Sequence, residues 1–282
     1  MMKLILSVIV LTILAIITFE TQAGWNNESG FQWRYDCEEN INDTKAIIIV
    51  LHGAGNNRLS SDNPSLLSDG DIKPFFDNSL SDCAILVVPE SGEFIYKDTR
   101  FKAWEYTKLY DRGAEMSRIE GLVILANQLF PDKPIFLIGA SAGANMAYGV
   151  ASELNNIRLG HKIAGTVLID VISPYSVSLT GGAPNAYGNI ISRKIGETLF
   201  YPFYDDDIYL QLGLPDKYSL WTMKTLILSS ANDPYVGNAV KEDFYKKLQR
   251  FSTDLTVINF GNGHSVGTEG FEIIGNWIDG NI

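Results

Sequence analysis

Short, predominantly apolar runs recur along the chain and predict strands that are buried on both faces. A strand covered on one side alternates apolar and polar residues, whereas a fully buried strand is apolar throughout. Runs of the second kind lie at residues 46–51, 84–88, 134–139, 164–169, 224–228 and 255–260. Residues 31–37 alternate instead, which predicts an edge strand.

Between several of these runs, apolar residues recur at the spacing of a helix. Residues 115–130 place apolar side chains on one wide face, namely Met116, Ile119, Leu122, Val123, Leu125, Ala126 and Leu129. Residues 144–154, 240–251 and 269–278 give further predicted helices. Strands that alternate with helices predict an α/β fold, with a mostly parallel central sheet and helices on both faces. We assign residues 24–282 to a single domain of this kind.

Two long segments interrupt the alternation. Residues 89–112 are rich in aromatic side chains, and residues 173–220 are longer and carry an acidic run at 205–207. Long excursions from a compact domain usually serve a function. We expect both to line a substrate pocket, with 173–220 as a cap-like insertion, and the alternative is that they decorate the surface.

The first 23 residues have the organisation of a secretory signal peptide. Lys3 supplies a positive start, residues 4–19 an apolar core, and residues 21–23 a cleavage site with small residues. The apolar core is shorter than the roughly 20 residues that span a bilayer. We therefore expect cleavage before Gly24 and a secreted or periplasmic protein with no stable membrane span. The alternative is an uncleaved N-terminal membrane anchor.

The composition and the net charge of the chain are typical of a globular protein that does not bind nucleic acids. The chain has 282 residues, 46% of them hydrophobic, which is typical of a globular protein. Its formal net charge is -11 and its pI is near 4.7. Such a chain offers no basic stripe for phosphates, so we exclude nucleic acid as a partner.

The chain has two cysteines, Cys37 and Cys83. In an exported protein this even count permits one disulfide. The alternative is two buried thiols that behave as small apolar residues. Neither cysteine has a neighbourhood rich in histidine or cysteine, so we expect no metal site at either.

The strongest chemical signal is the sequence Gly-Ala-Ser-Ala-Gly at residues 139–143. It lies between a predicted strand and a predicted helix, where the G-x-S-x-G pattern places a serine on a sharp turn with its Oγ exposed. The flanking glycines permit the tight turn, and the N-terminus of the following helix favours negative charge beside the serine. Ser141 is therefore the candidate nucleophile.

A nucleophilic serine needs a base within hydrogen-bond reach. The chain has only three histidines. His264 lies in the loop after the last predicted strand, at the sheet edge that Ser141 occupies, and it is the candidate base. His52 directly follows the first buried run, where we expect it to support the turn. His161 lies between a helix and a strand, where a capping or exposed role is natural.

The base in turn needs an acid that orients it. Asp233 lies in an Asn-Asp-Pro turn just past the fifth buried run, and the strand that delivers His264 follows after one helix. Asp170 ends the fourth buried run and is the alternative. Because of its position in this turn, Asp233 is the candidate acid.

Acyl transfer also needs donors for the oxyanion of the tetrahedral intermediate. The N–H of Ala142, directly after the nucleophile, is one candidate. The second is expected in the glycine turn at residues 52–55, with Ala54 as the first choice and Gly53 as the next.

Taken together, these segments resemble an α/β-hydrolase. They occur in the family's order, each after a strand, at residues 52–55, 139–143, 233–234 and 263–264. The resemblance covers residues 45–282 and implies the α/β-hydrolase fold with an insertion after the sixth strand. Within the superfamily, the short motifs are similar to secreted esterases of the polyhydroxybutyrate depolymerase and feruloyl-esterase type. That family often has an aromatic residue after the final histidine, whereas this chain has Ser265.

The sequence thus predicts a secreted serine hydrolase that cleaves carboxylic esters. Ser141 attacks the acyl carbon, His264 accepts its proton and Asp233 orients the imidazole; water then resolves the acyl-enzyme. No metal or organic cofactor is required, and the expected partner is a small-molecule or polymer-linked ester. A peptidase or thioesterase on the same fold is an alternative, as is a binding protein that has lost the chemistry.

Overall fold

The structure is a computed structural model that spans 282 residues. It describes residues 26–28, 31–35, 44–53, 84–89, 93–96, 99–102, 114–156, 163–171, 223–230, 233, 238–249, 254–260 and 267–282. The predicted signal peptide at 1–23 and the predicted cap-like insertion at 173–220 lie outside the described residues.

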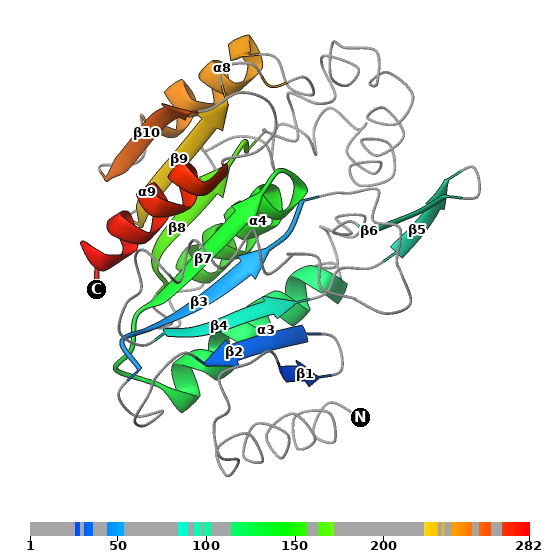
Figure 1. The fold of residues 1–282 in the computed structure, drawn as a ribbon, viewed down its shortest axis with the longest axis vertical. Coiled ribbons are helices and arrows are strands. Elements are labelled where there is room, and N and C mark those ends of the chain that lie inside the picture. Colours follow the sequence, from blue (N-terminus) through cyan, green and yellow to red (C-terminus); the bar gives the residue numbers. More distant parts are fainter. Residues whose placement is uncertain are drawn as a thin grey trace.

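An eight-stranded sheet forms the centre of the molecule (Figure 1). In spatial order its strands are β1 (Asn26–Glu28), β2 (Phe31–Tyr35), β4 (Ala84–Pro89), β3 (Ala46–Leu51), β7 (Ile135–Ala140), β8 (Ile163–Ile169), β9 (Lys224–Ser230) and β10 (Leu255–Phe260). The six strands from β4 to β10 in this order are parallel; β2 runs antiparallel to β4, and β1 runs antiparallel to β2. Every predicted apolar run thus lies in the parallel part of one sheet. The predicted edge strand is β2, and the three-residue β1 pairs on its outer side.

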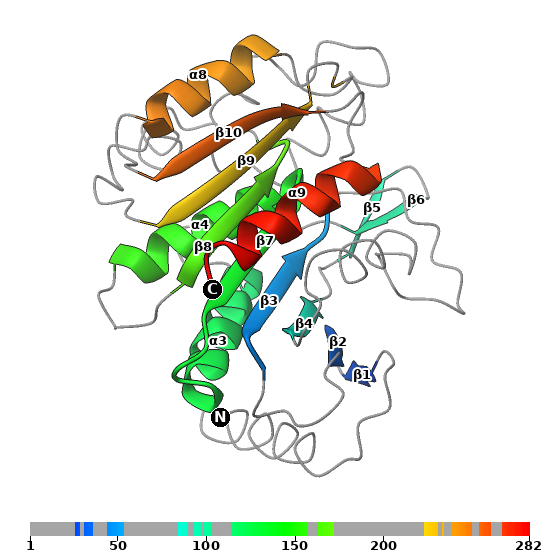
Figure 2. The same ribbon diagram turned by 60° about the vertical axis from the view of Figure 1, so that its left-hand side comes forward.

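Helices cover both faces of this sheet (Figures 1 and 2). The predicted helices are α3 (Ala114–Leu129), α4 (Ala142–Asn156), α8 (Asn238–Gln249) and α9 (Gly267–Asp279). Side chains of α3, α4 and α8 share one apolar cluster with the sheet, and those of α9 join a second cluster on the other face. The prediction of a parallel sheet covered on both sides is therefore confirmed.

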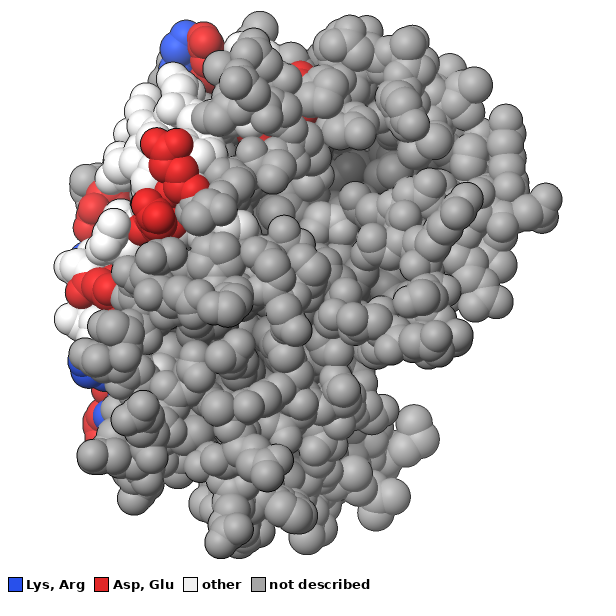
Figure 3. Space-filling view, in the orientation of Figure 1, with Lys and Arg blue, Asp and Glu red and all other residues white. Residues whose placement is uncertain are grey.

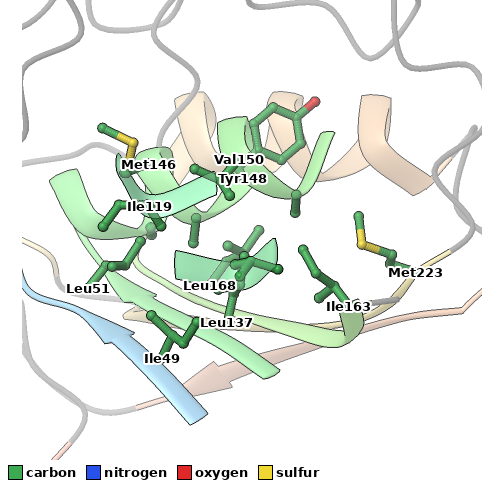
Figure 4. Close-up of a cluster of buried hydrophobic side chains, with 14 of the residues drawn as sticks. Ile49, Leu51, Ile119, Leu137, Met146, Tyr148, Val150, Ile163, Leu168 and Met223 are labelled. Atoms are coloured by element: carbon green, nitrogen blue, oxygen red, sulfur yellow. The ribbon is translucent and has the colours of Figure 1, made fainter. Parts of the chain in front are cut away.

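The larger cluster lies between the sheet and α3 and α4 (Figure 4). Leu51, Leu137 and Leu168 from three strands meet Ile119 of α3 and Met146 of α4, and each of these side chains is fully buried. Burial of such a side chain stabilises the fold by about 1.5–3 kcal/mol. This cluster holds α4, and therefore the turn that precedes it, firmly against the sheet.

On the other face, an aromatic pair anchors α9. Phe136 of β7 and Trp277 of α9 pack edge to face, with their ring centroids 6.1 Å apart. Gly165 of β8 makes room for the indole, because a Cβ at this position would lie 2.7 Å from Cη2 of Trp277. The docked helix follows directly on the connection between β10 and α9, so both ends of that connection are fixed to the sheet. His264 belongs to this connection.

The carboxyl ends of the six parallel strands meet at one edge of the sheet, where open α/β sheets bind their ligands. Ser141 directly follows β7, and Asp170 directly follows β8. Asp233 comes shortly after the end of β9. Candidate residues that are far apart in the sequence are thus delivered to one edge by neighbouring strands.

The aromatic segment at 89–112 contains a hairpin that the pattern did not predict. β5 (Glu93–Tyr96) and β6 (Thr99–Lys102) pair antiparallel in a separate two-stranded sheet. Each strand has four residues, too few for an alternating pattern to stand out. The expectation that this segment lines a pocket stays a prediction.

Cys37 and Cys83 lie outside the described residues, and their disulfide stays a prediction. Among the described residues, β2 and β4 pair antiparallel with Tyr35 opposite Ile85, and these two residues are each two positions from Cys37 and Cys83 in the sequence.

With this predicted disulfide, we expect the protein to gain the mass of two hydrogens on reduction, and its free energy of unfolding to fall by about 2–5 kcal/mol. Intact mass spectrometry before and after reduction, followed by thermal denaturation, checks both effects. Two thiols that react with an alkylating agent in the unfolded, unreduced protein would contradict this pairing.

Candidate active site

Ser141 has a backbone conformation that non-glycine residues rarely adopt. Its φ is 53°, in the left-handed region. Its N–H donates to the carbonyl oxygen of Ile169 at the end of β8 (2.8 Å), and its own carbonyl accepts from the N–H of Ala144 (3.0 Å). A residue held in such a conformation costs about 1–3 kcal/mol and persists where its surroundings fix it. This sharp turn between β7 and α4 is the conformation that the G-x-S-x-G context predicts.

The two glycines of this turn are needed for close backbone approach. A Cβ at Gly139 would collide with the carbonyl oxygen of Gly143. A Cβ at Gly143 would collide with the carbonyl oxygens of Leu51 and His52, at the end of β3. The first turn of α4 therefore lies directly on the backbone that leads into the glycine turn at 52–55.

Gly143→Ala is expected to destabilise the protein by about 1–3 kcal/mol, because the new methyl group would push α4 away from the end of β3. Activity should fall as well, since the same shift separates Ser141 from the turn at 52–55. Thermal denaturation and an ester assay measure the two effects.

Gly121→Ala is the matched control. Gly121 lies within α3 and is exposed, and beyond the adjacent backbone of its own helix a methyl group added there would have no atom within 4 Å. This substitution should stabilise the helix by about 0.5–1 kcal/mol. A Gly143→Ala variant as stable as wild type would contradict the close packing of the turn.

Gly53, in the predicted glycine turn, lies beside Ser141. A Cβ at Gly53 would lie 3.3 Å from the carbonyl oxygen of Ala140 and 3.4 Å from Cβ of Ser141. His52 is 4% exposed, and its Nδ1 lies 2.7 Å from the carbonyl oxygen of Gly53. Because a carbonyl oxygen can only accept, Nδ1 is the donor of this hydrogen bond. The imidazole of His52 thus holds the backbone of the turn.

The N-terminus of α4 supplies positive electrostatic potential next to Ser141. The helix begins at Ala142, directly after the serine, and its first turn contains no acidic side chain. The first N–H groups of a helix have no partner within the helix, and its dipole favours negative charge at this end. The role of Ala142 as an oxyanion donor stays a prediction.

A buried cluster of charged groups lies beyond the ends of β8 and β9. Lys241 of α8 is 1% exposed, and its Nζ lies 2.6 Å from Oδ1 of Asp170 and 2.7 Å from Oδ2 of Asp233. The same ammonium donates to the carbonyl oxygen of Ser230 at 3.2 Å. The two aspartates that the sequence offered as alternatives are thus joined by one cation.

Asp170 is fixed by its backbone as well as by its side chain. Its φ is 47°, and its N–H donates to the carbonyl oxygen of Leu228 (2.8 Å). Its Oδ1 also accepts from the N–H of Ser230 (2.7 Å). Aspartate is among the few non-glycine residues that tolerate a positive φ. Asp170 therefore ties the end of β8 to the end of β9.

Tyr245 borders the same cluster. Burial raises the pKa of its phenol, the charges of Asp170 and Asp233 raise it further, and a hydrogen bond with Ser229 lowers it. Burial has the largest effect. The hydroxyl of Tyr245 therefore stays protonated at neutral pH and adds no third negative charge to the cluster.

Among the predicted site residues, the structure describes Ser141, Asp233 and the backbone of Ala142. His264 and Ala54 lie outside the described residues, so their roles stay predictions. Lys241 was not predicted as part of the site. On α8 the buried positions include 241, 245 and 248, which share one helix face, so this lysine lies on an inward-facing row.

Two further searches cover the described part of the chain. No group of three or more histidine, cysteine, aspartate or glutamate side chains there could hold a metal ion. None of the helices in that part is long and apolar enough to cross a membrane. On the face shown in Figure 3, most of the charged side chains that the structure describes are acidic, in line with the net charge of -11.

No protein-family model matches the sequence, and neither does any curated protein. Solved structures do resemble it. A carboxylesterase from Bacillus cereus is 16% identical, with 89% of this chain and 95% of that chain covered and a TM-score of 0.53. Carboxyl esterase 2 from Tuber melanosporum is 16% identical, with coverage of 94% and 88% and a TM-score of 0.61. The esterase Pf2001 from Pyrococcus furiosus is 14% identical, with coverage of 94% and 93% and a TM-score of 0.51. At such identities the likeness shows a common fold.

Proposed function

We propose that this chain, which has the α/β-hydrolase fold, is a serine hydrolase that cleaves carboxylic esters. One observation carries the proposal: Ser141 holds a left-handed backbone conformation between a parallel strand and a helix N-terminus. A turn of this kind exposes a hydroxyl at the edge of the sheet where ligands bind. The esterases that share the fold are consistent with this chemistry.

In the proposed reaction, Oγ of Ser141 attacks the acyl carbon of the ester, and His264 accepts the hydroxyl proton. The tetrahedral intermediate carries its negative charge on the former carbonyl oxygen. The N–H groups of Ala142 and Ala54 stabilise this charge, and loss of one such donor typically costs roughly 10²- to 10³-fold in rate. His264 then protonates the leaving alcohol, and a water molecule releases the acid from Ser141.

Asp233 is the proposed acid that orients His264. Its side chain is fully buried, and it follows β9, the strand next to the one that leads into His264. Asp170 follows β8, one strand nearer to Ser141, and its Oδ1 is already held by Ser230 and Lys241. Its place after β9, next to the strand that leads into His264, is what favours Asp233.

We also propose that the protein is exported. The signal-peptide pattern at residues 1–23 supports cleavage before Gly24 and a secreted or periplasmic location. The narrower proposal is an esterase of the polyhydroxybutyrate depolymerase and feruloyl-esterase type, which rests on the short motifs around residues 52–55 and 139–143.

A substrate panel on the purified secreted form tests the proposed function. It compares nitrophenyl esters of increasing acyl length, feruloyl esters and a polyhydroxyalkanoate with peptide and thioester substrates. We expect the highest kcat/KM on an oxygen ester. A preference for a peptide or a thioester would reassign the substrate class, and no turnover with any of them would contradict the proposal and favour a binding protein.

A further inference from the structure

A buried lysine requires an explanation, because an ammonium taken out of water costs several kcal/mol unless other groups compensate for it. Lys241 is 1% exposed and lies on the face of α8 that also buries Tyr245 and Leu248. The reaction proposed above assigns it no step. Its position between both candidate acids indicates a role in the site.

The contacts of Lys241 match its donor capacity. A lysine ammonium has three N–H donors and no acceptor. Its Nζ contacts Oδ1 of Asp170, Oδ2 of Asp233 and the carbonyl oxygen of Ser230. One acceptor is available for each proton, so the direction of every N–H group is determined.

One side of this arrangement is rigid. Asp170 is held by its own backbone and by the N–H of Ser230, and the carbonyl of Ser230 also accepts from Lys241. Lys241 is therefore fixed to the carboxyl ends of β8 and β9. Asp233 is the only one of its three acceptors that lies beyond the end of a strand by several residues, so the ammonium transmits the rigidity of the sheet to this carboxylate.

The charges also fit a triad. Two carboxylates that approach the same point repel one another, and one tends to bind a proton. With the ammonium between them, the cluster keeps a single net negative charge. Tyr245 is within electrostatic range of both carboxylates and stays protonated, so it does not alter this balance. One negative charge is what an imidazolium beside Asp233 requires.

We propose that Lys241 is a positioning residue for Asp233. It binds Oδ2 and thereby directs Oδ1 toward the base, while Asp170 anchors the lysine and balances its charge. The role rests on the proposed function and acts through Asp233, without contact to the substrate.

The decisive variant is the double substitution Asp170→Asn and Lys241→Met. It removes one negative and one positive charge, so the net charge of the cluster is unchanged. The amide oxygen of the asparagine can still accept from the N–H of Ser230. Replacing a buried ion pair by neutral side chains is often compatible with folding. The variant therefore removes the contact between Lys241 and Asp233, together with the longer hydrogen bond to the carbonyl of Ser230, at an unchanged net charge.

We expect kcat of the double variant to fall on the order of 10²-fold, as misplacement of a group that supports catalysis can cost. KM should stay within about twofold, since Lys241 does not contact the substrate. Lys241→Met alone should be at least as inactive and less stable, because it leaves two carboxylates face to face. Lys246→Met is the control: Lys246 lies on the same helix with its side chain 71% exposed, and its loss should leave kcat unchanged.

A folded double variant with wild-type kcat would overturn the positioning role alone. Failure of the double variant to fold would also overturn it, because Lys241 would then serve the stability of the sheet. A wild-type protein that neither hydrolyses an ester nor reacts with a fluorophosphonate would instead overturn the proposed function, and this role with it.

Discussion

Replacing Ser141 by alanine is expected to abolish hydrolysis of a short-chain nitrophenyl ester. Without the hydroxyl there is no acyl-enzyme route, and removal of the nucleophile from a comparable triad lowers kcat by about 10⁶-fold. Stability should barely change. Alanine keeps the Cβ atom that lies next to Gly53. The substitution removes only the hydroxyl group of a half-buried side chain.

The measurement is kcat on the nitrophenyl ester, together with the midpoint of thermal unfolding. Ser117→Ala on α3 is a suitable control, because it removes a hydroxyl from an exposed side chain. Activity of Ser141→Ala close to that of wild type would exclude Ser141 as the nucleophile.

Asp233→Asn is expected to lower kcat by about 10⁴-fold, as loss of the orienting acid does in another serine triad. An amide has nearly the shape of the carboxylate but cannot stabilise an imidazolium, and it permits the wrong tautomer of the base. The protein should still fold, because Lys241 keeps Asp170 as its counter-ion.

Asp170→Asn, tested in parallel, separates the two candidate acids. We expect a much smaller loss there, since Asp170 acts on the lysine and on the N–H of Ser230. A mild effect of Asp233→Asn combined with a severe effect of Asp170→Asn would reassign the acid to Asp170.

The sequence predicted the parallel sheet well, because strands buried on both faces are apolar at every position. The runs at 46–51 and 255–260 coincide with β3 and β10, and the run at 134–139 differs from β7 by one residue at each end. The elements it missed, β1 and the hairpin of β5 and β6, have only three or four residues. At that length, hydrophobic periodicity carries no signal.

The turn around Ser141 was predictable because its geometry is a local property. Close backbone contacts within the turn and with the end of β3 require glycine at positions 139 and 143. The G-x-S-x-G pattern contains both glycines, so it predicts the turn. The left-handed φ of Ser141 follows from the same pattern.

The role of Lys241 was not predictable, because it depends on how α8 lies over the sheet. A lysine in a helix is normally assigned to the solvent-facing side. In this helix Lys241 shares the buried face with Tyr245 and Leu248, since the ends of β8 and β9 present two carboxylates to it. The sequence of residues 238–249 alone does not predict that two carboxylates lie beside this lysine.

Covalent labelling with a fluorophosphonate, followed by peptide mass spectrometry, shows whether Ser141 is an activated nucleophile. The reagent phosphonylates a serine only where a base and an oxyanion site activate its hydroxyl. We expect one equivalent of label on the peptide that contains Ser141, and none after Ser141→Ala or when His264 is replaced. A label on a different residue, or an unreactive folded protein, would contradict the assignment of Ser141.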